Sequence, residues 1–295
     1  MGTSKIAVAQ ESKISFGRLL KLGISIAFFC ACTLQETLFA LLGFRRKGYC
    51  VVLYYHAVAR EDRALFSRQM DLLLRWAKPI AADSKAICQP GERCVALTFD
   101  DGLESVIENA LPELVRRQIP STIFVVPESL GQFPIWMAST PASMNTRRVM
   151  SQAQLCNLHT SLVTIGSHSL THPNLTKIGT VEARRQICDS RNVLREMLGE
   201  EVSLFSFPYG AFNEDLVAWC REAGYSRVFT TIPSLALMIP GEYVLGRVGV
   251  ETTDWPLEFG LKLWGAYRWL PAAFALKRRV KIRWSRIAAR EFPMS

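Results

Sequence analysis

The feature that most constrains the fold is a regular alternation of two kinds of segment from Cys50 to Val250. Short runs rich in β-branched and aromatic residues have the length and content of buried strands, and the segments between them have helical spacing or helix-capping residues. The predicted strands cover residues 50–55, 95–99, 122–126, 162–165, 202–207, 227–230 and 243–250. The predicted helices cover residues 64–77, 105–118, 151–160, 180–198 and 213–222, the fourth with Thr180 as its N-cap.

Short strands that alternate with helices form βα units around a mainly parallel sheet. About seven such units would close, or nearly close, into a barrel. We therefore expect an α/β fold, a deformed (β/α)7-type barrel with helical extensions at both ends. The chain has 295 residues, 49% of them hydrophobic, which suits one large domain with appendages. The predicted parts are a hydrophobic, membrane-associated segment over 1–48, a barrel domain over 49–265 and a basic amphipathic helix over 266–295.

The predicted C-terminal helix carries much of the formal net charge of +9. Its basic residues are Lys277, Arg278, Arg279, Lys281, Arg283, Arg286 and Arg290. The aromatic residues interleaved with them or just before them are Trp264, Tyr267, Trp269, Phe274 and Trp284. Such a mixture favours a membrane interface, and a solvated helix face is the plainer alternative. We expect no nucleic-acid partner, because no recognised nucleic-acid module is present.

The N-terminal segment is apolar but interrupted. An apolar run from Leu22 to Leu34 is followed by Gln35 and Glu36, and a second run covers Thr37 to Phe44. Spanning a bilayer takes about 20 apolar residues, so neither run is long enough alone. We expect an uncleaved segment that lies in or dips into the membrane, with a signal peptide as the alternative. Basic residues flank this segment on both sides, so the positive-inside rule assigns it no orientation in the membrane.

The cysteines bear on location. The chain has eight cysteines and no C-x-x-C pair, and we interpret them as reduced thiols. Disulfides are rare in the cytoplasm, so this favours the cytoplasmic face of a membrane over a periplasmic or exported location. The sequence does not indicate an oligomeric state.

Polar residues follow four of the predicted strands. They are His56 after the first strand, Asp100 and Asp101 after the second, His168 and His172 after the fourth, and Pro208, Tyr209 and Gly210 after the fifth. The carboxyl ends of parallel strands share one rim of a barrel, so we expect these side chains to converge there. Three of the four histidines of the chain belong to this set.

The carboxylates and imidazoles have a joint interpretation as a metal site. Like charges at Asp100 and Asp101 repel, and a divalent cation relieves this when one acid is its ligand and the other is free to act as a base. Alternatively the two acids are a helix N-cap pair. His168 and His172, spaced i and i+4, suit one metal ion or are a pair of loop histidines. Two histidines and one carboxylate leave positions open for water and substrate, as catalytic sites do.

The two remaining features are less specific. His56 has the position of a catalytic side chain, but a lone histidine after a strand is more often a satisfied core residue. The run Phe205 to Gly210 is either a simple turn or a close backbone approach that supplies an oxyanion donor.

Three segments together resemble a known family. Thr98 to Gly102, His168 to Pro173 and Phe207 to Gly210 are similar, in order and spacing, to the three motifs of the polysaccharide deacetylases, the NodB-like carbohydrate esterases. The similarity runs from about Val51 to about Gly265. It implies metal-dependent hydrolysis of the N-acetyl group of amino sugars in a polysaccharide or glycan.

The resemblance also implies roles for individual residues. Asp101, His168 and His172 would bind a divalent metal, usually zinc, with cobalt, nickel or manganese as alternatives. Asp100 would be the general base, and the backbone N–H of Tyr209 would help to hold the oxyanion.

The chain departs from the family pattern at two places. Many members have an arginine where this chain has Ser206, and we expect Arg247 to take its place. Many members have a C-terminal catalytic histidine, and this chain has none after His172. The first strand resembles the Tyr-His pair of the poly-N-acetylglucosamine deacetylase branch, which implies that His56 is the acid. Asp254 and Trp255 resemble a late family motif.

Two further functions stay open at this point. One is deacylation of a lipid-linked amino sugar at the membrane, which the apolar and basic ends favour. The other is a non-catalytic member that binds glycan and scaffolds a membrane assembly, which the missing arginine and histidine would allow.

Overall fold

The computed structural model describes residues 15–85, 88–137, 147–158 and 161–276. The helices are α1 (Phe16–Leu41), α2 (Arg63–Trp76), α3 (Leu111–Arg116), α4 (Gln152–Cys156), α5 (Thr180–Leu198), α6 (Glu214–Glu222) and α7 (Pro256–Leu263). The strands are β1 (Tyr49–Tyr55), β2 (Lys78–Pro79), β3 (Arg93–Phe99), β4 (Ser121–Val125), β5 (Val163–Ser167), β6 (Leu204–Ser206), β7 (Arg227–Phe229), β8 (Val244–Leu245) and β9 (Val248–Gly249).

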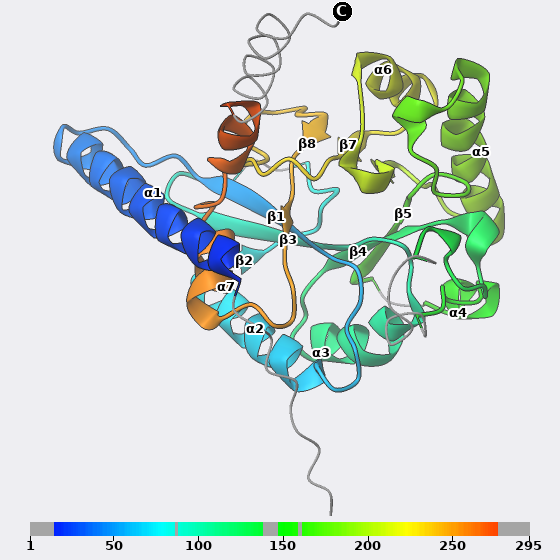
Figure 1. Ribbon diagram of the computed structural model, residues 1–295, viewed down its shortest axis with the longest axis horizontal. Coiled ribbons are helices and arrows are strands. Elements are labelled where there is room, and N and C mark those ends of the chain that lie inside the picture. Colours follow the sequence, from blue (N-terminus) through cyan, green and yellow to red (C-terminus); the bar gives the residue numbers. More distant parts are fainter. Residues whose placement is uncertain (1–14, 86–87, 138–146, 159–160, 277–295) are drawn as a thin grey trace, which may run out of the picture.

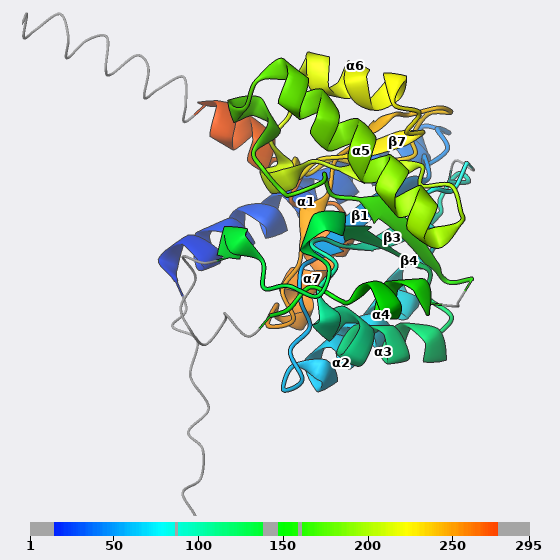
Figure 2. The ribbon, with the colours of Figure 1, turned by 90° about the vertical axis from the view of Figure 1, so that its right-hand side faces the viewer.

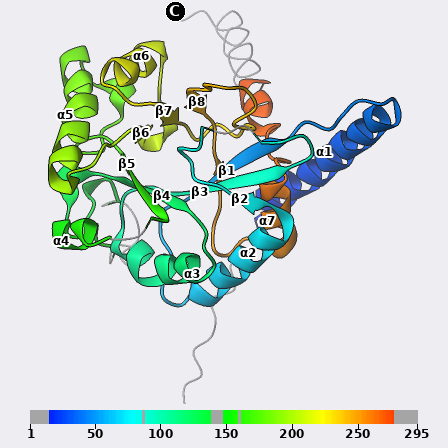
Figure 3. The ribbon, with the colours of Figure 1, turned by 180° about the vertical axis from the view of Figure 1, so that it is seen from behind.

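The strands form one parallel sheet that curls around an interior. Its order is β8-β7-β6-β5-β4-β3-β1-β9, with β2 beside β3. Helices α2 to α6 cover its outside, and α1 lies along one side next to α7 (Figures 1 and 3). The predicted barrel of βα units is confirmed.

Side chains of each strand alternate between the two faces of the sheet. Val51 and Leu53 belong to the core that packs against the helices. Cys50 and Val52 belong to a second core with residues of β3, β4, β6 and β7. Phe124 and Phe229, from strands that are not neighbours, approach to 5.2 Å between ring centroids, so this second core fills the barrel interior.

The last predicted strand, over 243–250, is wrong as a single element. It is split into β8, which pairs with β7, and β9, which pairs with β1 at the opposite end of the sheet. Only Gly246 and Arg247 separate the two strands. A Cβ at position 246 would lie 2.0 Å from the carbonyl oxygen of Ile232, so only glycine fits this junction. β8 and β9 are the two end strands of the sheet and are not paired with each other, so the two-residue junction between them closes the barrel.

Two further details differ from the sequence expectations. The N-cap of α5 is Gly179, not Thr180. The helix predicted from residue 105 begins as a π-helical turn, Val106–Ala110, before α3.

The interrupted apolar segment near the N-terminus is one continuous helix, α1. Gln35 and Glu36 are good helix formers and do not break it, so the expectation of two short pieces is wrong. Over 26 residues, α1 has the length and composition of a membrane-spanning helix. An anchor and a signal sequence both have these properties.

Three of the aromatic residues after α7 make contacts within the molecule, whereas Phe274 is exposed. The Trp264 ring stacks on Phe29 of α1 at 5.0 Å, and the Trp269 indole N–H donates to Ser25 Oγ at 3.0 Å. Tyr267 is buried, so the core continues past the predicted domain end at Gly265. These three side chains are therefore held by contacts within the chain, and the interfacial role of the C-terminal segment stays a prediction. The basic cluster from Lys277 to Arg290 lies outside the described residues.

The junction between β8 and β9 gives a test of barrel closure. We expect Gly246→Ala to destabilise the fold by about 1–3 kcal/mol, because the added Cβ forces backbone at Ile232 to move. Gly179→Ala is the control, since a Cβ there meets nothing within 4 Å. Urea unfolding monitored by tryptophan fluorescence measures both. Equal stability of the two variants would show that the junction is not tightly packed.

Candidate metal and catalytic site

A pocket of about 230 Å³ lies at the carboxyl ends of the strands. Its lining residues are Tyr54, His56, Asp100, Asp101, Trp136, Met137, His168, His172, Tyr209, Gly210 and Thr231. All six residues predicted from the sequence as metal ligands or catalytic groups are therefore in one place.

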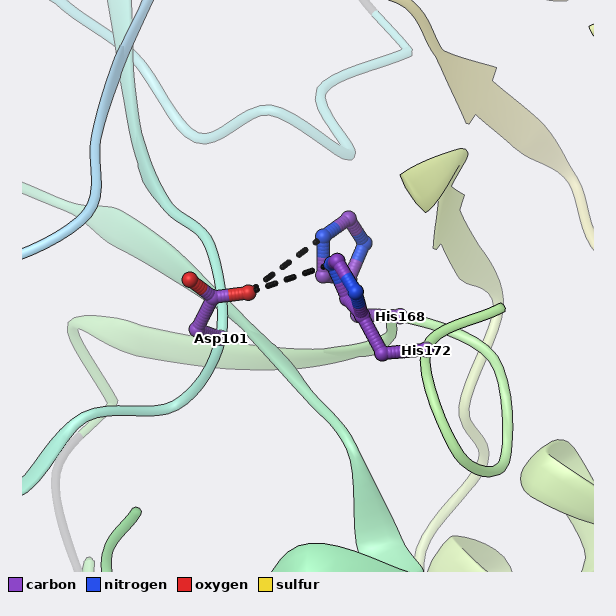
Figure 4. Close-up of side chains that lie close together, drawn as sticks. All are labelled: Asp101, His168 and His172. Atoms are coloured by element: carbon purple, nitrogen blue, oxygen red, sulfur yellow. Dashed lines mark ion pairs between the residues drawn. The ribbon is translucent and has the colours of Figure 1, made fainter. Parts of the chain in front are cut away.

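Three of these residues form a compact cluster. Asp101, His168 and His172 are buried, and their ligand atoms lie within 4.8 Å of one another. Asp101 Oδ1 is 3.4 Å from His172 Nε2 and 3.8 Å from His168 Nε2, and both rings turn toward the carboxylate (Figure 4). Atoms bonded to one ion at about 2.0–2.2 Å have separations of this size.

The two histidines are positioned by the loop that follows β5. His168 begins this loop, and its Nδ1 lies 2.8 Å from the carbonyl oxygen of Ser206, which leaves Nε2 for the cluster. Gln186 of α5 accepts hydrogen bonds from the backbone N–H groups of Leu170 and Thr171. Supports of this kind orient the ligands of metal sites.

The backbone at the site adopts unusual conformations. Six residues other than glycine have left-handed φ in the described chain, and four of them are at the site: Asp101, Ser169, His172 and Tyr209. Each such conformation costs about 1–3 kcal/mol and persists only where surrounding structure enforces it. The concentration at one pocket indicates that function, rather than packing, sets this geometry. It also excludes the simple N-cap interpretation of Asp101, whose side chain caps no helix.

The donor set fits a divalent metal ion. Asp101 Oδ1 is buried and has no hydrogen-bond partner, and burial raises the pKa of this carboxyl. A cation at the cluster would satisfy that oxygen and favour its ionised form. Burial also lowers the pKa of His172, which keeps its imidazole in the neutral form that binds metals.

The neighbouring carboxylate has a different environment. Arg247 donates from Nη1 to Asp100 Oδ1 at 2.7 Å and from Nη2 to Oδ2 at 2.8 Å. Burial raises the pKa of Asp100, but the Arg247 guanidinium outweighs it and holds the pKa below its usual range. The adjacent acids are thus separated, one paired with arginine and one facing the histidines. Arg247 therefore contacts the carboxylate that the family arginine is expected to tether, and its role as substitute stays a prediction.

Ser206 leaves room for this guanidinium. Arg247 Nη2 donates to Ser206 Oγ at 2.7 Å, Nη1 donates to Thr98 Oγ1 at 3.0 Å, and the guanidinium lies 4.7 Å from the Tyr54 ring centre. The side chain is fully buried. An arginine from the junction of β8 and β9 therefore occupies space beside the residue where many family members have theirs.

The two remaining predicted residues lie at the mouth of the pocket. His56 is exposed, so its interpretation as a core histidine is wrong, and its ring is 5.6 Å from that of Tyr54. Tyr209 has an exposed side chain, with its ring 4.8 Å from His172. Its left-handed backbone is followed by Gly210, where a Cβ would meet Thr231 Oγ1 at 1.9 Å.

Sequence reasoning missed Trp136. It comes from the long irregular stretch after β4, and its ring stacks on His172 with centroids 4.3 Å apart. The sequence from Glu128 to Met150 is long, irregular and rich in Pro, Ser, Thr and Met, and this length, typical of a functional loop, was the only signal for it. Residues 138–146 of the same stretch lie outside the described residues.

The fold is a curled parallel βα sheet, and an Asp-His-His cluster lies at the carboxyl ends of its strands. The protein is therefore a βα barrel with a candidate metal site at the rim where such barrels carry their chemistry. Residues 88–228 match the family model described as polysaccharide deacetylase. Over these residues the barrel domain is therefore similar to the polysaccharide deacetylase family.

Individual relatives agree with this similarity. IcaB from Ammonifex degensii is 26% identical, with a TM-score of 0.61 over 74% of this chain and 98% of that structure. YxkH of Bacillus subtilis is 26% identical over 55% of this chain and 53% of its own length. The peptidoglycan-N-acetylglucosamine deacetylase of Bacillus cereus is 27% identical over 44% of this chain and 42% of its own. This chain spans about half the length of these two curated relatives.

The cluster predicts selective loss of metal binding. We expect His172→Ala to weaken zinc affinity by more than about 100-fold, since even changes behind the ligands cost about 10–100-fold. His56→Ala is the matched control, because His56 shares the pocket but not the cluster. Titration calorimetry of the metal-free full chain with zinc measures both. Equal affinities would place the ion elsewhere.

Proposed function

We propose that this protein is a divalent-metal-dependent hydrolase that removes the N-acetyl group from amino sugars of a glycan. The observation that carries the proposal is the pairing, in one pocket, of a metal-type cluster with a separate carboxylate. Asp101 faces His168 and His172, while Arg247 holds Asp100 ionised beside them. The polysaccharide deacetylase family model and the activity named for the Bacillus cereus relative support the substrate class.

Asp101, His168 and His172 would hold the ion, with zinc first and cobalt, nickel or manganese as alternatives. A divalent ion supplies Lewis acidity, which makes water more acidic and polarises an amide carbonyl. Asp100 accepts the proton of the attacking water. Its ionised state at neutral pH follows from the bidentate contact with Arg247, which also fixes its direction.

The attack forms a carbon–oxygen bond at the acyl carbon, and the carbon–nitrogen bond then breaks. The Tyr209 backbone N–H donates to the carbonyl oxygen as negative charge develops on it. His56 donates a proton to the leaving nitrogen, which gives a free amino sugar and acetate. The exposed position of His56 at the pocket mouth suits contact with a bound sugar.

The location proposed for this reaction is a membrane surface, with the cytoplasmic face favoured. Helix α1, with its exposed apolar residues, supports the membrane surface, and the eight free cysteines support the cytoplasmic side. A lipid-linked amino sugar is accordingly the second candidate substrate. A non-catalytic glycan-binding scaffold is disfavoured, because the missing family arginine is replaced in space by Arg247.

The enzyme and scaffold functions separate in one assay. We expect the full chain to release acetate from an N-acetylglucosamine oligomer, and a chelator to abolish the release. Asp100→Asn should lower turnover by about 10²–10⁴-fold, because the amide cannot accept the proton, with zinc content retained. Acetate measured by coupled assay and metal measured by mass spectrometry give both quantities. Normal turnover in Asp100→Asn would refute the assignment of the base.

His56 is tested separately as the acid. We expect His56→Ala to lower turnover by about 10²–10⁴-fold on an N-acetyl sugar. The loss should be much smaller on an aryl acetate ester, whose leaving group needs no protonation. Comparison of kcat on the two substrates is the measurement. An equal loss on both would mean that His56 acts on the fold of the pocket and not on the leaving group.

A further inference from the structure

One face of α1 is bound to the barrel along most of its length. The residues of this inner face recur every three or four positions: Arg18, Leu22, Ser25, Phe29, Cys32 and Glu36. Arg18 donates to Glu258 at 2.6 Å and lies over the Trp255 ring, and Ser25 is fully buried. Arg268 donates to Cys32 Sγ at 3.1 Å. The helix is therefore a fixed part of the domain.

The resemblance of Asp254 and Trp255 to a late family motif gains a local explanation here. Asp254 accepts from Lys262 Nζ at 2.6 Å and from the backbone N–H of Glu251. Its other oxygen is 3.8 Å from Arg18. These two residues hold the N-terminal end of α1 on the barrel.

The opposite face of α1 has no charged residue. The charges of the helix are Arg18, Lys21 and Glu36, and all three lie on the bound side of the helical wheel. The exposed large apolar residues include Phe16, Leu20, Leu34, Leu38 and Leu41. An apolar face of this extent is unfavourable in water and marks an interaction surface.

Basic residues gather beside the C-terminal end of α1, at a pocket that the bound side of the helix helps to line. A largely apolar pocket of about 450 Å³ lies where α1 ends, lined by Phe39, Phe44 and Met238 among others. Four cations also line it: Arg45, Arg46, Lys47 and Arg268. Glu36 is the only acid among its lining residues. Apolar walls with a cationic rim match the headgroup and upper chain of an anionic lipid, which a second copy of this basic chain would not.

The bound face excludes a crossing of the bilayer. The contacts from Arg18 to Cys32 cover about 21 Å of helix, against a hydrocarbon thickness of about 30 Å. A membrane-spanning α1 would draw Glu258, Lys262 and Arg268 of the barrel into hydrocarbon with it. A cleaved α1 would leave the rings of Trp264 and Trp269 uncovered.

We propose that α1 lies in the plane of an anionic membrane surface, with its apolar face in the lipid and its other face fixed to the barrel. The pocket lined by Arg45, Arg46, Lys47 and Arg268 takes the headgroup of an anionic lipid. This deepens the proposed membrane location and is independent of the proposed reaction.

Vesicle binding tests the lipid surface. We expect the full chain to float with phosphatidylglycerol-containing vesicles and much less with phosphatidylcholine vesicles. Leu34→Glu should lower the bound fraction at least about tenfold, since it places a charge at the centre of the apolar face. Val181→Glu adds the same charge to an exposed apolar site on α5 and should have no effect. Acetate release from a soluble oligomer should be unchanged in both variants, which separates this test from that of the reaction.

The plane of α1 is tested by the accessibility of its two ends. Ser15→Cys and Lys47→Cys, in separate full-length variants, are treated with an impermeant maleimide in right-side-out and inverted membrane vesicles. Peptide mass spectrometry locates the label. An in-plane helix gives both ends labelled in the same vesicle orientation. Labelling in opposite orientations, or binding that ignores Leu34→Glu and lipid charge, would overturn the proposal.

Discussion

The buried ion pair between Arg247 and Asp100 is the interaction on which both the barrel and its chemistry depend. Arg247 lies in the two-residue junction between β8 and β9, and Asp100 directly follows β3. The pair therefore links the junction between the two end strands of the sheet to the end of β3, through the barrel interior. Removing one partner of a buried pair costs about 3–5 kcal/mol, because the other charge is left without compensation. The contact between Arg247 and Asp100 thus both holds the barrel closed and orients the proposed base.

The position of this arginine shows that a carboxylate after β3 can be held by a side chain from the junction of β8 and β9. The family arginine would come from β6, where this chain has Ser206. Arg247 comes from across the barrel, and its guanidinium contacts Ser206 Oγ and the Asp100 carboxylate together. What the chemistry needs is a bidentate donor on that carboxylate, and several strands of a small barrel point into the same interior.

The sequence was most informative where polar residues follow strands. His56, Asp101 and His168 could be placed at one rim because parallel strands end together, and Arg247 was found because the family pattern left a gap at Ser206. The split of the last strand could not be predicted, because it depends on Gly246 approaching Ile232 in another loop. Trp136 was missed for a similar reason: stacking on His172 carries no local pattern.

The ends of the chain show the same limit more strongly. The composition of α1 and of the segment around Trp264 and Trp269 suggested two separate membrane contacts. In the fold these segments cover each other in part, and the outer apolar face of α1 is left exposed. Apolar content predicts that a face will be covered but not by what, since that depends on contacts more than two hundred residues apart, such as Arg18 with Glu258.

Ion binding and stability should be coupled at the site. Asp101, Ser169, His172 and Tyr209 adopt left-handed backbone conformations, each at a cost of about 1–3 kcal/mol, and Asp101 also has an unpaired buried oxygen. The fold can meet this cost because Gln186, Ser206 and Arg247 hold the surrounding loops. An ion that binds only the folded chain adds stability in proportion to the logarithm of its concentration above its Kd. Ion binding would therefore offset the cost of the strained rim, and the same carboxylate that destabilises the metal-free fold is the one best prepared to hold a cation.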